Sequence, residues 1–289
     1  MARESRRICT YNVFEGLDCW HEQRVAAFKD WVVRQDLDVL GLNEANKFTP
    51  EVLRELAAQC GLAHCHLHET RTGFHLGVMS RHPIKVLDTA ALCSAMHHGL
   101  LHVLVDFPGE ACHVLVTHLT PFEASRRREE ARAILAHAMP FEAEPLLLLG
   151  DLNSLSANDR VLHDHDRLLA GVICKVPKLQ RKFCNGDGCV DYEPINILYE
   201  GGFLDVPSTR AEPSTTVPTP ANRDSAHVGG RLDYLLLKGA LADAVRSNGS
   251  CGISLTTVKD DATDFASDHY PVVLELQASV WAAPSDPST

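Results

Sequence analysis

The chain has 289 residues, of which 45% are hydrophobic and 22% charged, and this composition is typical of a soluble globular protein. It excludes a mostly disordered chain, and the longest apolar run, at 146–149, is far shorter than the roughly 20 residues that a helix needs to cross a bilayer. The 27 Lys and Arg residues are outnumbered by 38 Asp and Glu residues, which gives a formal net charge of −11. Such a surface excludes nonspecific wrapping of duplex DNA, but it leaves room for a local basic groove or for carboxylates that hold a cation.

The N-terminal residues carry no visible secretory signal, because the polar segment 1–7 leads directly into a short strand-like run. Ten cysteines without such a signal are more typical of reduced thiols than of a disulfide framework. We therefore expect a soluble intracellular protein, located in the cytoplasm, with a nuclear location left open.

Eight short runs rich in Val, Ile and Leu are predicted to be strands, because each is bounded by Gly, Pro, Asp or Asn. In chain order they cover residues 8–13, 37–42, 74–80, 100–107, 112–118, 146–149, 232–237 and 272–276. Helical patterns cover residues 21–35, 50–60, 123–137 and 194–200. The second of these is well delimited, since Thr49 is placed to cap it, Pro50 suits its first turn and Gly61 follows its end.

Many strands with fewer helices between them favour two packed sheets flanked by helices over an alternating parallel sheet. We expect one domain over residues 1–278. Within it, residues 168–192 match no regular element and are predicted to be a long surface insertion. Residues 279–289 are rich in Pro, Ser and Ala and are predicted to be a flexible tail.

Polar side chains gather where the predicted strands begin or end. Since strand ends lie along the rims of a sheet, segments far apart in the sequence can meet there. The segments concerned are Tyr11-Asn12, Asn43-Glu44, Thr117-His118-Leu119, Gly150-Asp151-Leu152-Asn153-Ser154, Arg231-Leu232-Asp233-Tyr234 and Ser267-Asp268-His269-Tyr270-Pro271.

Together these segments would supply several carboxylates and amides and two imidazoles. Oxygen ligands without a quartet of Cys and His favour a hard cation such as Mg²⁺ over zinc. A hard cation beside imidazole and amide donors suits phosphoryl chemistry, in which negative charge must be stabilised and a water activated.

Taken singly, each segment also has a plainer interpretation. Glu44 could be a solvated loop acid, Asp151 part of a turn, and His118 a hydrogen-bonded packing residue. Asp268 with His269 could be a helix cap or a turn. Asp233 is harder to explain in this way, because an acid between the leucines of a core strand needs a partner, for which an imidazolium is a candidate.

The order and spacing of the segments resemble the endonuclease/exonuclease/phosphatase superfamily, which includes DNase I, apurinic endonucleases, deadenylases, tyrosyl-DNA phosphodiesterase, sphingomyelinases and inositol polyphosphate phosphatases. Gly150-Asp-X-Asn153 followed by Ser267-Asp-His269 is the most specific pair of signatures, and the resemblance extends over residues 7–276. The expected fold is α+β, a four-layer αββα sandwich of two stacked, mostly antiparallel sheets flanked by helices.

The resemblance implies a role for each matching residue. Asn12, Glu44 and Asp268 would belong to a metal site that takes Mg²⁺, with Mn²⁺ as the alternative ion. His269, oriented by Asp233, would be the base or a phosphate-contacting imidazole.

Asp151 would orient or deprotonate the attacking water, while Asn153 and His118 would donate to the phosphate. Whether Asp151 or His269 is the base, and whether one or two metal ions operate, stays open at this stage.

Three departures from the family pattern narrow the expected class of substrate. Asn43 stands where Gln commonly precedes the metal-binding Glu, which could alter substrate contacts. Ser154-Leu155-Ser156 replaces the aromatic-Arg pair of inositol phosphatases, and Thr117-His118-Leu119 differs from the Asn-X-Tyr pattern of apurinic endonucleases. These features favour deadenylases, tyrosyl-DNA phosphodiesterase or bacterial relatives.

Four basic residues are candidates for substrate binding: Arg126, Lys178, Arg181 and His227. Arg126 starts a helix, and Lys178 and Arg181 lie in the insertion with Lys175 and Lys182. The alternative for all of them is a solvated surface. A zinc site built from Cys174, Cys184 and Cys189 with His163 or His165 is a weaker alternative, because the close paired spacing of zinc ribbons is absent.

The sequence thus predicts a Mg²⁺-dependent phosphoester hydrolase, and most specifically a phosphodiesterase or nuclease. Its substrates would be nucleic acid ends or nucleotides, cleaved by in-line attack of an activated water. One alternative is a phosphatase or phosphodiesterase of small or lipid-derived phosphoesters, and another is a catalytically silent binding module. The natural substrate and the oligomeric state stay open.

Overall fold

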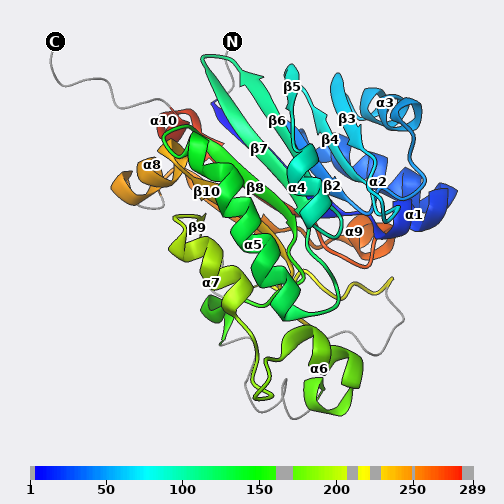
Figure 1. Ribbon diagram of the computed structural model, residues 1–289. Helices are drawn as coiled ribbons and strands as arrows, with labels where there is room; N and C mark the ends of the chain where they lie inside the picture. Colours follow the sequence, from blue (N-terminus) through cyan, green and yellow to red (C-terminus); the bar gives the residue numbers. More distant parts are fainter. Residues whose placement is uncertain (1–3, 161–171, 207–213, 222–228, 249–250, 282–289) are drawn as a thin grey trace, which may run out of the picture.

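A computed structural model describes residues 4–160, 172–206, 214–221, 229–248 and 251–281, and within these ranges it contains two six-stranded sheets (Figure 1). The first sheet has the strand order β11 (Ile253–Thr257), β12 (Val272–Gln277), β1 (Ser5–Asn12), β2 (Val39–Asn43), β4 (Leu76–Ser80), β3 (His64–His68). The second has the order β5 (Ile84–Leu87), β6 (Leu100–Phe107), β7 (Glu110–His118), β8 (Leu146–Asp151), β10 (Asp233–Lys238), β9 (Leu204–Asp205).

Each sheet contains one parallel pair, and the other pairings are antiparallel. In the first sheet β1 and β2 run parallel, so that Asn12 pairs with Asn43 at their ends. In the second sheet β7 and β8 run parallel, and His118 pairs with Asp151. The polar residues that end these four strands are thereby brought to one edge of the sandwich.

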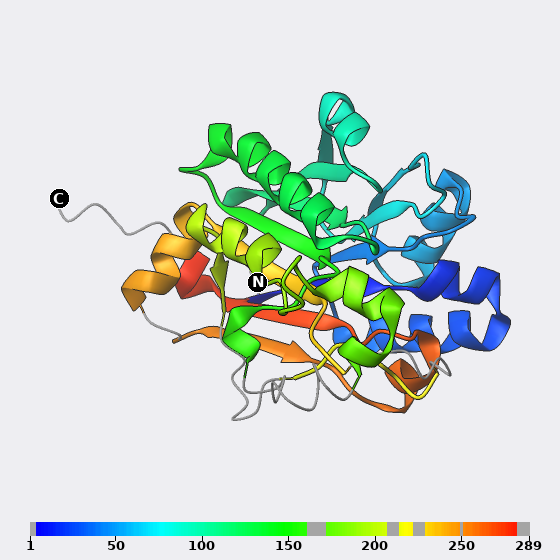
Figure 2. The ribbon, with the colours of Figure 1, turned by 60° about the horizontal axis from the view of Figure 1, so that its bottom comes forward.

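The two sheets pack face to face, and helices cover their outer faces (Figures 1 and 2). The interior between the sheets is apolar and includes Val39, Val116, Leu149 and Leu274, none more than 1% exposed. Against the first sheet lie α2 (Glu22–Gln35), α3 (Pro50–Gln59) and α9 (Asp261–Ala266), and against the second lie α5 (Ala124–Ala138) and α7 (Glu193–Glu200). The predicted four-layer sandwich is confirmed.

The remaining helical segments are short or lie at the rim. They are α1 (Phe14–Trp20), which has left-handed dihedrals with φ between +40° and +72°, α4 (Ala90–Ala95), α6 (Pro177–Phe183), α8 (Ala240–Asn248), α10 (Ala278–Trp281), and the 3₁₀ turns η1 (Met139–Phe141), η2 (Ala157–Asp159) and η4 (Ile173–Lys175). In the part of the chain that the structure describes, no helix is long and apolar enough to cross a membrane.

All eight predicted strands and all four predicted helices occur, with ends shifted by up to a few residues. The elements that the sequence did not indicate are short or only partly buried. Strand β3 carries three His residues and has a single buried position, Leu67, while β5 has none. These strands pair at the sheet edges, where burial imposes little hydrophobic pattern.

The insertion contains more structure than the sequence indicated. From residue 172 onward it forms η4 and α6 and closes with a bridge between Cys184 and Val190. Its apolar side chains form a small core with segments of the main domain, comprising Ile173, Leu179, Phe183 and Val190 with Leu155, Val217 and Leu232. We call residues 172–192 the insertion lobe. Residues 168–171 lie outside the described part of the chain.

The packed part of the chain extends through α10 to Trp281, three residues past the expected boundary at 278. Val280 and Trp281 are 2% and 4% exposed, and the indole of Trp281 packs edge-on against Phe107 and beneath the guanidinium of Arg6. The rest of the predicted tail, 282–289, lies outside the described residues.

Gly150 allows β8 to lie against β7 just before Asp151. Its φ is +146°, and a Cβ atom there would lie 1.8 Å from the carbonyl oxygen of Thr117. We expect Gly150→Ala to lower the free energy of unfolding by at least about 2 kcal/mol, because backbone must move on both strands. Urea denaturation checks this.

The matched control is Gly186→Ala, whose Cβ would meet no atom within 4 Å. It should change the free energy of unfolding by no more than about 0.5 kcal/mol. Equal midpoints for the two variants would contradict the role given to Gly150.

Candidate active site

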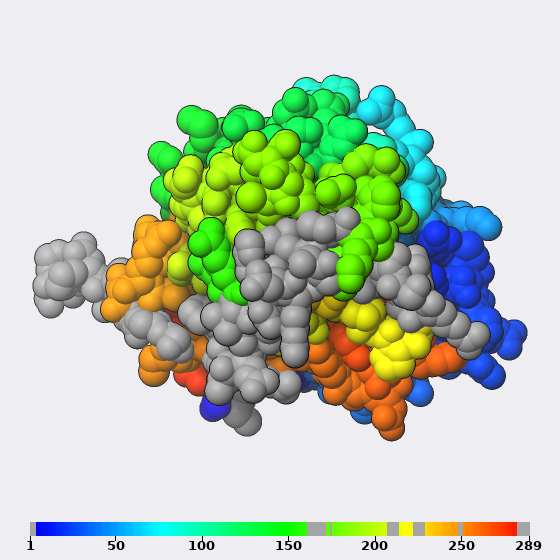
Figure 3. Space-filling view, turned by 90° about the horizontal axis from the view of Figure 1, so that it is seen from below, coloured from blue at the N-terminus to red at the C-terminus, as the bar shows by residue number. Residues whose placement is uncertain are grey.

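The candidate site lies where the ends of β1, β2, β7 and β8 meet the beginnings of β10 and β12. The insertion lobe and residues 214–221 border this end of the molecule, green and yellow in Figure 3, above the orange segment that leads into β12. Of the predicted catalytic and metal-binding residues, seven are no more than 8% exposed, and Glu44 is partly buried.

Asn12 links the two sheets at the centre of the site. Its Nδ2 donates to Glu44 Oε1 at 3.0 Å and to Asp151 Oδ2 at 3.1 Å, and its Oδ1 accepts from the Phe14 N–H. Glu44, with φ of +59°, also accepts from the Glu15 N–H at 2.9 Å. The left-handed segment α1 therefore supplies a backbone donor to the Glu44 carboxylate.

Asp151 ends β8 and faces two imidazoles. Its Oδ2 lies 3.5 Å from His118 Nε2 and 3.8 Å from His269 Nε2, while its Oδ1 accepts from the Asn153 N–H at 2.8 Å. Asn153 adopts φ of +48° and donates from Nδ2 to the Leu119 carbonyl. The Gly-Asp-X-Asn and Thr-His-Leu segments are thus joined directly.

Asp233 has the imidazole partner that its burial in a core strand requires. Its Oδ2 lies 2.8 Å from His269 Nδ1, and the carboxylate is 1% exposed. The Ser267 hydroxyl donates to the Asn12 carbonyl and accepts from the His269 N–H, which holds the Ser-Asp-His segment against the end of β1.

Burial and neighbouring charges set the protonation of the site. Burial, reinforced by the charge of Asp268, raises the pKa of Glu44 to about 7. Burial and the nearby His269 lower the pKa of His118 to about 3. For His269 burial acts in the same direction, but the carboxylates of Asp233, Asp268 and Asp151 prevail and raise its pKa to about 10. At neutral pH the site therefore contains a neutral His118 and an imidazolium at His269.

Among the described residues, Asp151, Asp233 and His269 form a group that could hold a metal ion, with one ligand atom of each within 4.8 Å of the others. Asp233 and His269 already satisfy one another, however. The metal ligands expected from the sequence, Asn12, Glu44 and Asp268, lie beside this group, and the charge of Asp268 contributes to the raised pKa of Glu44.

Asn43, which departs from the family pattern, is fully buried. Its Nδ2 donates to the Thr117 carbonyl at 2.7 Å, and its Oδ1 accepts from the Asp151 N–H at 3.0 Å. Both ends of this amide are used to join β2 to β7 and β8. Asn43 thus has a positioning role that the sequence did not reveal.

The predicted substrate-binding residues differ in placement. Arg126, on α5, is exposed and pairs with Glu129 at 2.5 Å. Lys178 and Arg181 are exposed on α6, and His227 lies outside the described residues. The alternative zinc site also lies partly outside, since His163, His165 and the Cys174 side chain are not described.

The basic group of the insertion also contains Lys182, which lies nearer the candidate site than the sequence indicated. Burial lowers the pKa of the Lys182 ammonium to about 8, and the carboxylates of Asp151 and Glu44 act in the opposite direction. Buried Arg127 fixes this part of the lobe by donating to the Lys182 carbonyl, the Ser154 hydroxyl and the Thr120 carbonyl. Arg127 is the middle residue of the run Arg126-Arg127-Arg128 and is 1% exposed.

Comparisons with known proteins identify the family and the fold. A model of the endonuclease/exonuclease/phosphatase family matches residues 9–269. None of the curated proteins compared with the chain matches it significantly.

Three solved structures illustrate the likeness in fold. An AP endonuclease from Archaeoglobus fulgidus has a TM-score of 0.64 at 16% identity, covering 93% of this chain and 98% of that one. TDP2 from D. rerio, complexed with a single-strand DNA product, has 0.61 at 17%, covering 96% and 100%. An endonuclease/exonuclease/phosphatase from Beutenbergia cavernae has 0.61 at 21%, covering 95% and 72%.

The Asp233–His269 pair should be detectable in the metal-free protein by the titration of His269. Histidine NMR titration should show one imidazole with a pKa far above 6.5, absent from His269→Asn. Asp233→Asn should lower that pKa by about 1 to 3 units, because an adjacent opposite charge contributes that much.

The same pair should make the free energy of unfolding depend on pH. Because the folded-state pKa of His269 is raised, its stabilising effect is complete below pH 6.5 and is lost as pH rises toward 10. A wild-type pKa near 6.5, or one that Asp233→Asn leaves unchanged, would contradict the charged pair.

Proposed function

Because the chain belongs to the endonuclease/exonuclease/phosphatase family and is therefore a phosphoester hydrolase, we propose that it is a Mg²⁺-dependent phosphodiesterase or nuclease that acts on nucleic acid ends or nucleotides. The observation that carries the proposal is the convergence of Asp151, His118 and His269 beside the carboxylates of Glu44 and Asp268.

The residues present fit a divalent metal ion. The Glu44 carboxylate is largely removed from solvent beside the like charge of Asp268, and its hydrogen-bond donors are the amide of Asn12 and the Glu15 N–H. Burial and the like charge of Asp268 raise the pKa of Glu44, and a cation between the two carboxylates would relieve their repulsion. Glu44, Asp268 and the Asn12 amide would hold Mg²⁺, since hard oxygen ligands suit that ion. When bound, it would supply electrostatic stabilisation of the charge that develops on the phosphate.

The protonation states favour Asp151 as the base. His269 is already an imidazolium, held by Asp233, and has no site free to accept a proton at neutral pH. Asp151 is the remaining acceptor facing the same space, so it takes the proton of the attacking water. His269 Nε2 then donates to the phosphate or the leaving oxygen.

His118 and Asn153 complete the set of hydrogen-bond donors. With a pKa of about 3 the His118 imidazole stays neutral and carries one proton, which it can offer to a nonbridging oxygen as charge builds up. The Asn153 amide uses one of its two Nδ2 hydrogens on the Leu119 carbonyl, and the second is available to the phosphate.

The preference for nucleic acid ends over long duplexes rests on charge and on likeness of fold. A net charge of −11 opposes extended wrapping, whereas the cations of α6 provide a local positive surface, formed by Lys178, Arg181 and Lys182. TDP2, complexed in its solved structure with a single-strand DNA product, shares this fold. Short single-stranded ends therefore suit the site best.

The test compares hydrolysis of bis-p-nitrophenyl phosphate and p-nitrophenyl phosphate with Mg²⁺ and with EDTA. Asp151→Asn should lower diester turnover at least about 100-fold, because it removes the base while keeping the shape of the side chain. The control Asp106→Asn, on an exposed acid of β6, should keep full activity. Cleavage that survives EDTA or Asp151→Asn would overturn the proposal.

Preference for the monoester would instead support a phosphatase of small phosphoesters. Absence of hydrolysis of both esters and of short oligonucleotides would support a silent binding module.

Lys182 provides a second prediction. Lys182→Ala should raise KM for a short oligonucleotide about five- to tenfold at pH 7, because one cation near the phosphate is worth roughly 1 kcal/mol. Since the ammonium loses its proton above a pKa of about 8, this difference should shrink toward none by pH 10.

Lys85→Ala, on the exposed edge strand β5, is the control and should leave KM unchanged at every pH. A Lys182→Ala effect of equal size at pH 7 and pH 10 would show that the role is structural rather than electrostatic.

A further inference from the structure

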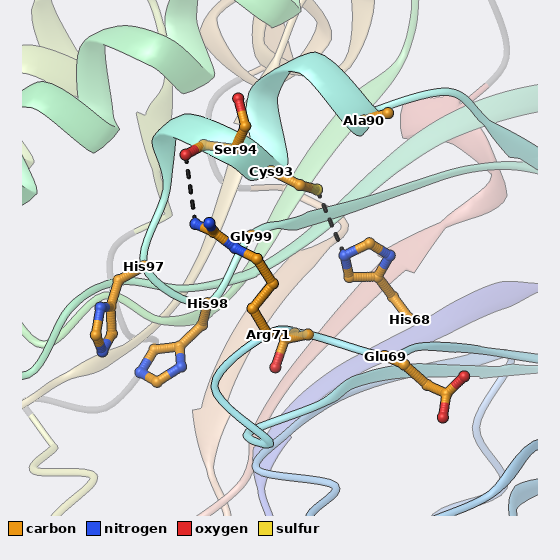
Figure 4. Close-up of a pocket in the computed structure, with 10 residues that line it drawn as sticks. His68, Glu69, Arg71, Ala90, Cys93, Ser94, His97, His98 and Gly99 are labelled. Atoms are coloured by element: carbon orange, nitrogen blue, oxygen red, sulfur yellow. Dashed lines mark hydrogen bonds between the residues drawn. The ribbon is translucent and has the colours of Figure 1, made fainter.

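A cavity of about 200 Å³ opens beside the candidate active site, between the loop after β3 and the segment from α4 to β6 (Figure 4). The chemically active side chains that line it are His68, Glu69, Arg71, Cys93, His97 and His98. Its volume is below the roughly 300 Å³ at which pockets for drug-sized ligands begin, so it suits a small molecule rather than a strand of nucleic acid.

The sulfur of Cys93 is held by an imidazole and a backbone amide. Sγ lies 3.4 Å from His68 Nε2, from the Thr89 hydroxyl and from the Leu100 carbonyl oxygen, and it accepts from the Leu100 N–H at 3.5 Å. Gly99 makes this arrangement possible: a Cβ atom there would lie 3.2 Å from both the Cys93 sulfur and His68 Nε2. Figure 4 shows the Cys93 thiol and the His68 imidazole facing one another at the wall of the pocket.

Of these contacts, the His68 imidazole and the Leu100 N–H favour the thiolate. Burial alone would raise the pKa of Cys93, but the hydrogen bonds of His68, Leu100 and Thr89 outweigh it and lower the pKa to about 7. Cys93 is only half-buried, so a small reagent can reach it. A partly exposed, ionised thiol is the form that attacks disulfides.

The second observation in the pocket concerns the imidazole of His98. His98 is 3% exposed, and its Nε2 has no hydrogen-bond partner among the described residues. Burial lowers the pKa of His98 to about 2, so the ring is neutral and carries one proton.

The Thr72 hydroxyl lies 2.6 Å from His98 Nδ1 and 3.1 Å from the Thr70 hydroxyl, and its proton can be donated to either. In both tautomers of the ring, Nε2 is a buried polar atom without a hydrogen-bond partner among the described residues. Arg71 supplies a cation at the same pocket, while the Glu69 carboxylate points away from the sulfur in Figure 4. The Arg71 cation suits a carboxylate on a small ligand.

The pocket is coupled to the catalytic side chains through one ring. The His98 imidazole stacks on His118, with ring centroids 4.4 Å apart at an interplanar angle of 20°. The Thr117 hydroxyl, next to His118, donates to the Gly99 carbonyl at 3.0 Å. A group that displaces His98 or Gly99 would therefore move His118.

We infer that Cys93 is a modification site, at which the thiolate exchanges with the disulfide of a small, carboxylate-bearing thiol and thereby lowers turnover through His98 and His118. In the exchange the Cys93 sulfur attacks one sulfur of the disulfide, and a new S–S bond forms as the old one breaks. Cys93 is oxidised, and the departing thiol sulfur is reduced and takes a proton from solvent. A reducing thiol reverses the step.

The first experiment measures reactivity alone, independently of any hydrolysis. The full-length reduced protein and N-acetylcysteine amide compete for the disulfide of 3-mercaptopropionate, and peptide mass spectrometry quantifies the adduct at Cys93. The ratio of the Cys93 rate to the free-thiol rate should fall about twentyfold from pH 6 to pH 9. The reason is that the pKa of Cys93 is about 7, whereas that of an ordinary thiol is near 8.5. Steric access cancels in this comparison because it affects both pH values equally.

Two variants separate the sources of the effect. His68→Gln should reduce the change with pH to less than about threefold, since the imidazole favours the thiolate. Arg71→Gln should slow the acidic disulfide about threefold but not the neutral disulfide of 2-mercaptoethanol, because only the former carries a charge. The proposed modification site would be overturned if the ratio of the two rates were the same at both pH values, or if His68→Gln left its change with pH unaltered.

The effect on turnover rests on the proposed function and is measured separately. Modified wild type should hydrolyse the diester at least threefold more slowly and recover with dithiothreitol, whereas Cys93→Ser should be insensitive to the disulfide. Adduct formation without loss of turnover would overturn the coupling to His118. If no form of the protein hydrolysed the diester, the labelling result would still stand, and the proposed function would be the part that fails.

Discussion

The carboxylate of Asp151 is the contact on which the site depends, because it joins the two sheets and faces both imidazoles. One oxygen accepts from Asn12 of the first sheet and lies within 3.8 Å of His118 and His269, while the other accepts from the Asn153 N–H. The Asp151 backbone is tied to the first sheet as well, through Asn43. A buried carboxylate lowers stability unless its hydrogen-bond partners are in place, so the packing of the two sheets and the arrangement of the site depend on the same contacts.

The same burial creates the electrostatic contrast that hydrolysis needs. Two imidazoles lie within 4 Å of one carboxylate, yet one is neutral and the other is charged, because only His269 has Asp233 behind it. Glu44 and Asp268 form a second, like-charged region beside them. Acid, base and cation-binding functions are therefore separated by environment rather than by residue type. The Cys93 pocket is lined by His98, whose ring stacks on the neutral imidazole of His118.

The sequence predicted the fold and the convergence of the site well, for a physical reason. Central strands such as β8, with four consecutive leucines, carry a strong pattern, and the residues that end them meet because parallel neighbours end at the same edge. Asn43, Arg127 and Lys182 were not recognised in their roles. Each acts through contacts between distant segments, and nothing local distinguishes a buried Arg127 from its exposed neighbour Arg126. The histidine-bearing strand β3 was missed because one of its five positions is buried.

The most direct test of the account is Mn²⁺ binding, followed by the loss of the free-ion electron paramagnetic resonance signal. The account predicts that the metal-free wild type binds Mn²⁺, and that Glu44→Gln and Asp268→Asn each weaken the affinity at least about tenfold, since each removes one anionic oxygen ligand. Asp106→Asn, which changes net charge equally on an exposed strand position, should bind as tightly as the wild type. Equal affinities for all four proteins would contradict a metal site between Glu44 and Asp268, and with it the proposed chemistry.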